Sequence, residues 1–359
     1  MFSMLRNFIS RHKRKFVITA LIFSVGVTSL HYARRKLIEF QEKQAKEFIE
    51  KNRRIQHFES TERTCNQAVY NLYPNVVEVI AKLYDTNNIL QELREKTLEL
   101  STNQKIELWD QLLIKSFTRL VTLIYSSTIL VIHLRIQLNI LAGFIFKEID
   151  KSEKTISQEI QNRYLSLIQH FIKDGIRELA LIIRNNTEGI LKKYNFKQKL
   201  DLSELEQLFW SIQMAVNQAL DNSNNNSLVK ILLPSECDVA DSVLIKNLLT
   251  ETIDMLETDE IFNILTNHLG LGFSTATDEI AKFFSTTTSN NKDVTESSNK
   301  EFVNVTQVKI PLAKLVPIID GLAPKTLVDS PFSINLINML INSDKIKMLG
   351  ANTYEVFCN

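Results

Sequence analysis

Residues 16–33 read FVITALIFSVGVTSLHYA, an apolar run of 18 positions without Asp, Glu, Lys or Arg. A helix rises about 1.5 Å per residue, so this run extends about 27 Å, close to the thickness of a bilayer's hydrocarbon core. Basic residues flank the run on both sides: Arg11, Lys13, Arg14 and Lys15 precede it, and Arg34, Arg35 and Lys36 follow it. The sequence therefore predicts a short basic segment at residues 1–15 and a transmembrane anchor at residues 16–33.

Two alternatives to a permanent anchor are a cleaved signal peptide and a buried N-terminal helix. A signal peptide also has a basic start and an apolar middle, but this run is longer than usual and lacks a clean small-x-small cleavage site. A permanent anchor fits these features best. Five Lys or Arg lie in residues 1–15 and seven in residues 34–53, and the larger number favours a cytosolic C-terminal side.

Composition sets the class of the remaining chain. The three cysteines, Cys65, Cys237 and Cys358, are odd in number and far apart, a pattern that is neither a disulfide framework nor a CxxC metal site. They fit a reducing, cytosolic setting. The formal net charge of +1 indicates no basic surface for nucleic acid, so no nucleic-acid partner is expected.

The distribution of proline favours long helices. Residues 75–233 contain no proline and are rich in helix-forming side chains. We therefore predict an all-α fold, an elongated bundle of long helices preceded by a single N-terminal transmembrane helix. Residues 34–57 are predicted to form a helical stalk with Glu-to-cation pairs four residues apart, and residues 58–359 a cytosolic helical-bundle domain. The polar segment 285–301 is predicted to be a flexible loop in that domain.

Hydrophobic periodicity places individual helices along the domain. They are expected at residues 66–84, 86–98, 103–148, 152–196, 201–221, 238–257, 258–284, 308–323, 331–343 and 344–357. Soft breaks are expected at Gly175 and Gly189. Capping side chains are expected at Ser101, Asp201 and Thr258, because Ser, Asp and Thr accept hydrogen bonds from the free N–H groups of a first helical turn.

The segment 103–148 is apolar enough to suggest a second transmembrane span. It contains His133, Arg135, Gln137 and Asn139, however, and a charged arginine is costly at the centre of a span. A central bundle helix that is buried on most sides is the better interpretation. His133 is then a core or capping residue, because no second His or Cys lies at metal-ligand spacing.

Motifs for catalysis are missing from the sequence. It has no GxGxxG, P-loop, HExxH or GxSxG pattern, and its six histidines are scattered. We therefore predict no enzymatic activity, no catalytic residue, no cofactor and no metal site.

Trp109 is the most distinctive candidate for binding. With Lys105, Leu112 and Ser116 it follows the spacing i, i+4, i+7 and i+11, which puts these residues on one helix face. Two interpretations stay open. The indole can belong to the core, or it can rim a hydrophobic groove for a partner helix, since Trp is enriched at interface hot spots.

Several sequence blocks resemble the peroxin-3 family of peroxisomal biogenesis factors, in the same order nearly from end to end. The blocks are Arg11-His12-Lys13, His57-Phe58-Glu59-Ser60, Arg63-Thr64-Cys65-Asn66, Leu108-Trp109-Asp110, Ser116-Phe117-Thr118-Arg119, Leu134-Arg135-Ile136-Gln137-Leu138-Asn139-Ile140, Pro311-Leu312-Ala313-Lys314 and Pro317-Ile318. The resemblance implies a single-pass protein of the peroxisomal membrane whose all-helical domain faces the cytosol. It also implies that this domain docks peroxin-19, the soluble chaperone that delivers newly made peroxisomal membrane proteins.

The resemblance further implies a binding site. An amphipathic N-terminal helix of peroxin-19 is expected in a groove at the membrane-distal end of the bundle, with Trp109 as its anchor. Lys105 and Leu112 match neighbours on the same face, and Lys314 matches a lysine on the rim. Leu93 is expected as a wall residue. Family members can have a basic residue at the position of Leu113, so one electrostatic contact is expected to be missing or replaced here.

Other expectations concern location and partners. Lipids of the peroxisomal membrane are expected to surround the anchor, and the protein can reach that membrane directly or through the endoplasmic reticulum. The alternative function is a membrane tether that links peroxisomes to an inheritance or autophagy adaptor, as some family members do. A binding site away from Trp109 would distinguish the tether from the docking receptor.

Overall fold

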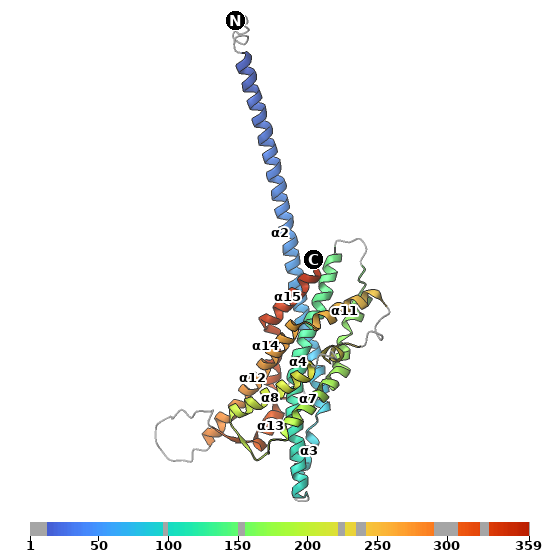
Figure 1. Cartoon of the computed structure of the whole chain (residues 1–359), viewed down its shortest axis with the longest axis vertical. Helices are drawn as coiled ribbons and strands as arrows, with labels where there is room; N and C mark the ends of the chain where they lie inside the picture. Colours follow the sequence, from blue (N-terminus) through green and yellow to red (C-terminus); the bar gives the residue numbers. More distant parts are fainter. Residues whose placement is uncertain are drawn as a thin grey trace, which may run out of the picture. The chain divides into compact units, whose positions relative to one another are not determined.

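The fold is taken from a computed structural model that describes residues 13–95, 100–149, 155–221, 227–234, 242–290, 308–323 and 330–358. Its backbone contacts separate two units, residues 1–59 and residues 60–359. Nearly all described residues of both units are helical (Figure 1). The predicted all-α fold is confirmed.

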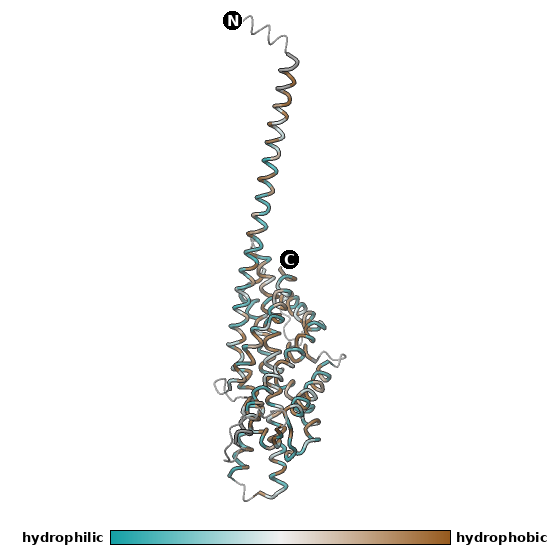
Figure 2. Tube along the Cα trace, turned by 90° about the vertical axis from the view of Figure 1, so that its left-hand side faces the viewer, coloured by the Kyte–Doolittle hydropathy of each residue, from teal (hydrophilic) through white to brown (hydrophobic). Residues whose placement is uncertain are grey.

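Helix α2 (Lys13–Leu83) contains the predicted anchor, the predicted stalk and the predicted helix 66–84 without a break, and Pro74 lies inside it. Nine apolar side chains between residues 17 and 32 are exposed, from 52% for Val17 to 74% for Phe23. Figure 2 shows the hydrophobic colouring at this end of α2 and mixed colouring further along it. Lipid tails would remove these side chains from water, so the segment fits a single transmembrane helix.

The basic residues beside this segment are described only in part. Arg11 and the rest of residues 1–12 lie outside the described residues, whereas Lys13, Arg14 and Lys15 form the start of α2. On the C-terminal side, Arg34, Arg35 and Lys36 are exposed, and the guanidinium of Arg35 lies 3.4 Å from the carboxylate of Glu39.

Helix α4 (Thr102–Glu148) is the central helix of the second unit (Figure 1). It contacts α7 (Ile176–Leu191), α13 (Leu312–Leu322) and α15 (Asp344–Cys358), and every side chain from Ser116 to Gly143 is buried. Its length and hydropathy would allow it to cross a membrane, but 89% of its most apolar 18-residue window is buried inside the protein. The predicted central bundle helix is therefore confirmed.

His133 is a core residue of α4. It is completely buried and lines a small internal space with apolar side chains only, among them Ile129, Leu232 and Leu265. Burial lowers the pKa of its imidazole to about 4, because a charged ring is poorly solvated in the core. The side chain is thus neutral near pH 7, in agreement with its interpretation as a core residue.

The second unit contains further helices. They are α3 (Asn87–Glu95), α5 (Gln158–Leu165), α6 (Ile168–His170), α8 (Leu202–Asp221), α9 (Ser227–Leu232), α11 (Val243–Leu256), α12 (Asp259–Asn290) and α14 (Pro331–Asn342). A short antiparallel pair joins β1 (Lys199–Leu200) to β2 (Ile310–Pro311), with Lys199 opposite Pro311. This pair, which the sequence analysis does not predict, brings the segment after α7 to the start of α13.

Three predicted helix starts are confirmed by their hydrogen bonds. The Ser101 hydroxyl accepts from the Gln104 N–H while the Gln104 side chain accepts from the Ser101 N–H, which is a capping box. Asp201 and Glu204 form the same reciprocal pair, with both bonds at 2.9 Å. The Thr258 hydroxyl accepts from the N–H of Ile261.

Two predicted boundaries are wrong. Helix α12 continues to Asn290, so residues 285–290 are helical, because Phe284 is anchored in the core and no Gly or Pro follows it before Asn290; residues 291–301 lie outside the described residues. The expected helix 152–196 is interrupted after Leu165, resumes at α6, continues through a π-helix, η1 (Phe171–Gly175), and ends with α7 at Leu191. The soft break expected at Gly189 is absent, because Gly189 lies inside α7. The π-helix lets Phe171, Ile172 and Gly175 all face the core.

Candidate docking site

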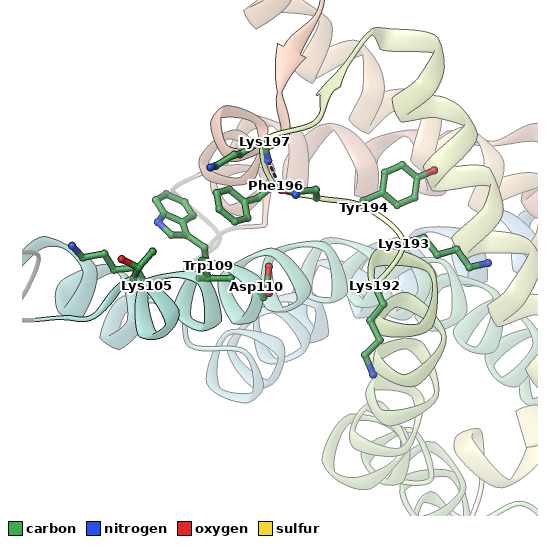
Figure 3. A pocket seen from close by; sticks show the side chains of 11 residues that line it. Lys105, Trp109, Asp110, Lys192, Lys193, Tyr194, Phe196 and Lys197 are labelled. Atoms are coloured by element: carbon green, nitrogen blue, oxygen red, sulfur yellow. Dashed lines mark hydrogen bonds between the residues drawn. The ribbon is translucent and has the colours of Figure 1, made fainter.

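A groove with a volume of about 590 Å³ lies at the N-terminal end of α4. One wall is the first two turns of α4, and the other is the segment that follows α7 (Figure 3). The lining residues are Thr102, Lys105, Ile106, Trp109, Asp110, Lys192, Lys193, Tyr194, Asn195, Phe196 and Lys197. We call this surface the Trp109 groove.

The α4 wall follows from the start of that helix. The capping box at Ser101 sets the helical register, and residues three or four apart then share a face. Thr102, Lys105 or Ile106, and Trp109 line the groove with this spacing. Trp109 is half-buried and packs against the core. It therefore has properties of both earlier interpretations: it is supported by the core and remains accessible at the groove.

The second wall is held by backbone hydrogen bonds. The carbonyl of Phe196 accepts from the Ala313 N–H at 2.9 Å, and the carbonyl of Gln198 accepts from the Leu312 N–H at 2.8 Å. The Asn195 side chain accepts from the Lys197 N–H at 3.0 Å. Because the first N–H groups of α13 lack partners inside their own helix, these bonds satisfy them and fix the position of Phe196.

Cations surround the aromatic part of the groove. Four lysines and one carboxylate, Asp110, line it, and in Figure 3 Lys105 and Lys197 flank the rings of Trp109 and Phe196. Lys192 and Lys193 project away from these rings, and the Lys192 amine lies 3.0 Å from the Glu188 carboxylate. The groove thus combines two aromatic rings with an excess of positive charge, a surface suited to a ligand with apolar and acidic groups.

The structure brings together only some of the predicted site residues. Lys105 and Trp109 line the groove, as expected from their shared face. Lys314 is exposed in the first turn of α13, directly after Ala313, which is hydrogen-bonded to Phe196. Leu93 on α3 is half-buried against the core and is not a lining residue of the groove.

Two predicted contact residues are core residues in the structure. Leu112 is 0% exposed and Leu113 is 3% exposed, so neither offers a surface to a partner. The expectation that Leu112 presents apolar area on the face of Trp109 is therefore corrected. One turn beyond Trp109, α4 is already covered by neighbouring helices, and the additional aromatic area comes from Phe196 instead.

The second wall is not predicted from the sequence. Residues 192–197 read KKYNFK, in which cations alternate with aromatic side chains. That composition is typical of a binding surface, but the segment was assigned to the end of a long helix. The composition of residues 192–197 is visible in the local sequence. The position of this segment opposite Trp109, however, depends on the pairing of β1 with β2.

Comparisons with known proteins cover nearly the whole chain. The family model described as Peroxin-3 matches residues 7–105, 95–144 and 147–354. Peroxisomal biogenesis factor 3 of Bos taurus is 33% identical over 379 residues, covering 99% of this chain and 98% of the relative. The protein of the same name from Homo sapiens is 32% identical and covers 98% and 96%. The one from Saccharomyces cerevisiae is 24% identical and covers 74% of each chain.

Proposed function

The chain belongs to the peroxin-3 family, and on this premise we propose that it docks peroxin-19 in the Trp109 groove. Family membership gives the chain a role in peroxisome biogenesis, and members of the family are biogenesis factors rather than enzymes. Together with the exposed apolar segment of α2, it supports a location in the peroxisomal membrane. In the proposed topology, residues 16–33 span the membrane, residues 34–57 form the stalk, and residues 58–359 face the cytosol and receive the partner.

One observation carries the proposal: Trp109 remains accessible beside Phe196 in a groove flanked by lysines. An amphipathic helix buries its apolar stripe in such a groove, where aromatic side chains supply much of the binding energy. Acidic residues beside that stripe would meet Lys105 and Lys197, which steer the encounter and set the orientation. Lys314, which follows the residue that fixes Phe196, would extend the basic rim.

Replacement of Trp109 by alanine tests the groove directly. We expect the affinity for a labelled peroxin-19 N-terminal helix to fall by about 30-fold or more, equivalent to about 2 kcal/mol, because the truncation removes the main apolar contact. The measurement is fluorescence anisotropy with the full chain in nanodiscs. Circular dichroism checks that the variant keeps its helical content.

The chain offers a matched control in its other tryptophan. Trp210 on α8 is 63% exposed and is not a lining residue of the groove, so Trp210→Ala should leave the affinity within about twofold. Equal losses for both variants, or binding unaffected by Trp109→Ala, would contradict the proposed site. No binding by the folded wild-type chain would contradict docking itself and favour the tether.

The lysines beside the rings should act mainly on the association rate. For Lys105→Glu combined with Lys197→Glu, we expect association at low salt to slow by about tenfold or more, with a smaller difference at high salt, because salt screens the attraction. Stopped-flow kinetics at two salt concentrations measures this. The control is Lys246→Glu with Lys345→Glu, which makes the same charge change at exposed positions of α11 and α15. An equal effect of both pairs would show that net charge, and not the groove, steers the partner.

A further inference from the structure

The part of α2 that follows the anchor has an uncovered apolar face. The exposed side chains on it include Leu37 at 57%, Phe48 at 66% and Ile55 at 45%. These three are 11 and 7 residues apart, and at about 100° per residue such spacings return to nearly the same side of a helix. Gln41, Gln44 and Lys51 complete a seam in which the intervals alternate between four and three residues. Such alternation is typical of the contact line of a coiled coil.

Charged side chains are concentrated on the opposite side of this helix. On that side lie Glu39, Glu42, Lys43, Lys46 and Glu50, and some of them form ion pairs along the helix, such as that between Lys43 and Glu47 at 3.9 Å. Further apolar residues, Ile38 and Phe40, flank the seam and are 47% and 58% exposed, whereas Ile49, which is 64% exposed, lies on the same side of the helix as Glu42. The segment is therefore amphipathic, and its apolar side chains are exposed.

A membrane surface does not account for this face. The headgroup layer is about 5–8 Å thick on each side of the hydrocarbon core. Phe48 and Ile55 lie 12 and 19 residues beyond Lys36, which places them about 18 Å and about 28 Å further along the helix. The helix also has no Gly or Pro between Gly26 and Pro74 at which it could turn back onto the bilayer.

We propose that residues 37–55 of α2 pair in parallel with the same segment of a second copy of this chain. Two copies anchored in one membrane by the same residues have the same orientation and the same height above the bilayer. Each seam residue therefore meets its own counterpart, Leu37 with Leu37 and Phe48 with Phe48. The pairing rests on the anchor and the stalk and is independent of the Trp109 groove.

The glutamines favour a second copy over an unrelated apolar partner. An amide group both donates and accepts hydrogen bonds, so Gln41 and Gln44 can each pair with the identical residue across the seam. A polar residue in such a seam fixes the register at a cost in stability. Lys51 weakens the seam, but its long side chain can carry the amine to water.

Disulfide trapping in the membrane tests the pairing. Gln44→Cys puts a thiol in the seam, and Lys46→Cys puts one on the charged side of the same turn. In full chains reconstituted in liposomes and treated with a mild oxidant, we expect Gln44→Cys to yield at least about ten times more covalent dimer than Lys46→Cys. The unsubstituted chain gives the background from its native cysteines. Equal yields from the two positions would indicate random collision and overturn the proposal.

A second variant tests the apolar contact itself. Adding Phe48→Glu to the Gln44→Cys chain should lower the dimer yield at least about fivefold, because like charges would face each other in the seam. Adding Lys43→Glu introduces a carboxylate on the charged side and should leave the yield unchanged. If the yield is the same with Phe48→Glu, the apolar face does not hold the two copies together and the proposal is wrong.

Discussion

Arg135→Leu is expected to lower the free energy of unfolding by about 3–5 kcal/mol, the usual cost of leaving one partner of a buried ion pair without the other. Arg135 is completely buried on α4, and its guanidinium contacts Glu62 and Asn66 of α2. It also donates to the carbonyl of Ile341 on α14 at 3.4 Å. One side chain thus connects three helices, and its loss leaves the largely buried carboxylate of Glu62 without its counter-charge.

The double variant Arg135→Leu with Glu62→Leu separates charge from packing. Replacement of a whole buried pair by apolar residues is often neutral or stabilising, so the double variant should recover much of the stability that the single variant loses. Urea unfolding of the full chain in detergent, followed by circular dichroism, gives both values. If the single and double variants are equally unstable, the packing and hydrogen bonds of Arg135 matter more than its charge.

Gly175→Ala is expected to lower the free energy of unfolding by about 3 kcal/mol through steric overlap. Gly175 ends the π-helix, and a methyl group there would overlap the carbonyl oxygen of Ile231 on α9. It would also lie 3.1 Å from the ring of Phe171. The backbone conformation of Gly175 is an ordinary helical one, with φ at −60°, so the effect is caused by contact alone.

Gly189 provides the matched control in the following helix. A methyl group at Gly189 would meet nothing within 4 Å, and the residue lies inside α7. Gly189→Ala should therefore raise the free energy of unfolding by about 0.5–1 kcal/mol, because alanine loses less backbone entropy in a helix. Thermal and urea unfolding of the two variants should shift in opposite directions. A loss at Gly189 or no loss at Gly175 would contradict the close approach of η1 and α9.

Sequence reasoning predicts the helices of this protein well where the signal is local. The capping pairs at Ser101 and Asp201 specify helix starts through neighbours three residues away. The polar residues within the apolar part of α4 indicate a protein core rather than a lipid environment, and Arg135 indeed has protein partners there. Predictions are wrong where packing changes the local pattern, as in the interruption of the helix after Leu165 and the extension of α12 beyond Phe284.

The candidate site is predicted on one wall only. The spacing of Lys105 and Trp109 places both on one face, and the structure puts both in the groove. The same spacing includes Leu112, which is completely buried. Helical periodicity predicts which residues share one side of a helix. It does not predict how far along the helix a neighbouring element covers that side. The opposite wall with Phe196 needs a contact between segments that are distant in sequence.

The sequence by itself determined the apolar anchor segment, the helix starts and the apolar character of α4, because these depend on the length, composition and capping of contiguous residues. Only the tertiary structure decided that Trp109 stays accessible while Leu112 and Leu113 are covered. It also decided that the segment with Phe196 lies across from Trp109, through its hydrogen bonds with the start of α13. Burial and juxtaposition depend on partners that chain folding brings together from far apart, and local patterns do not encode them.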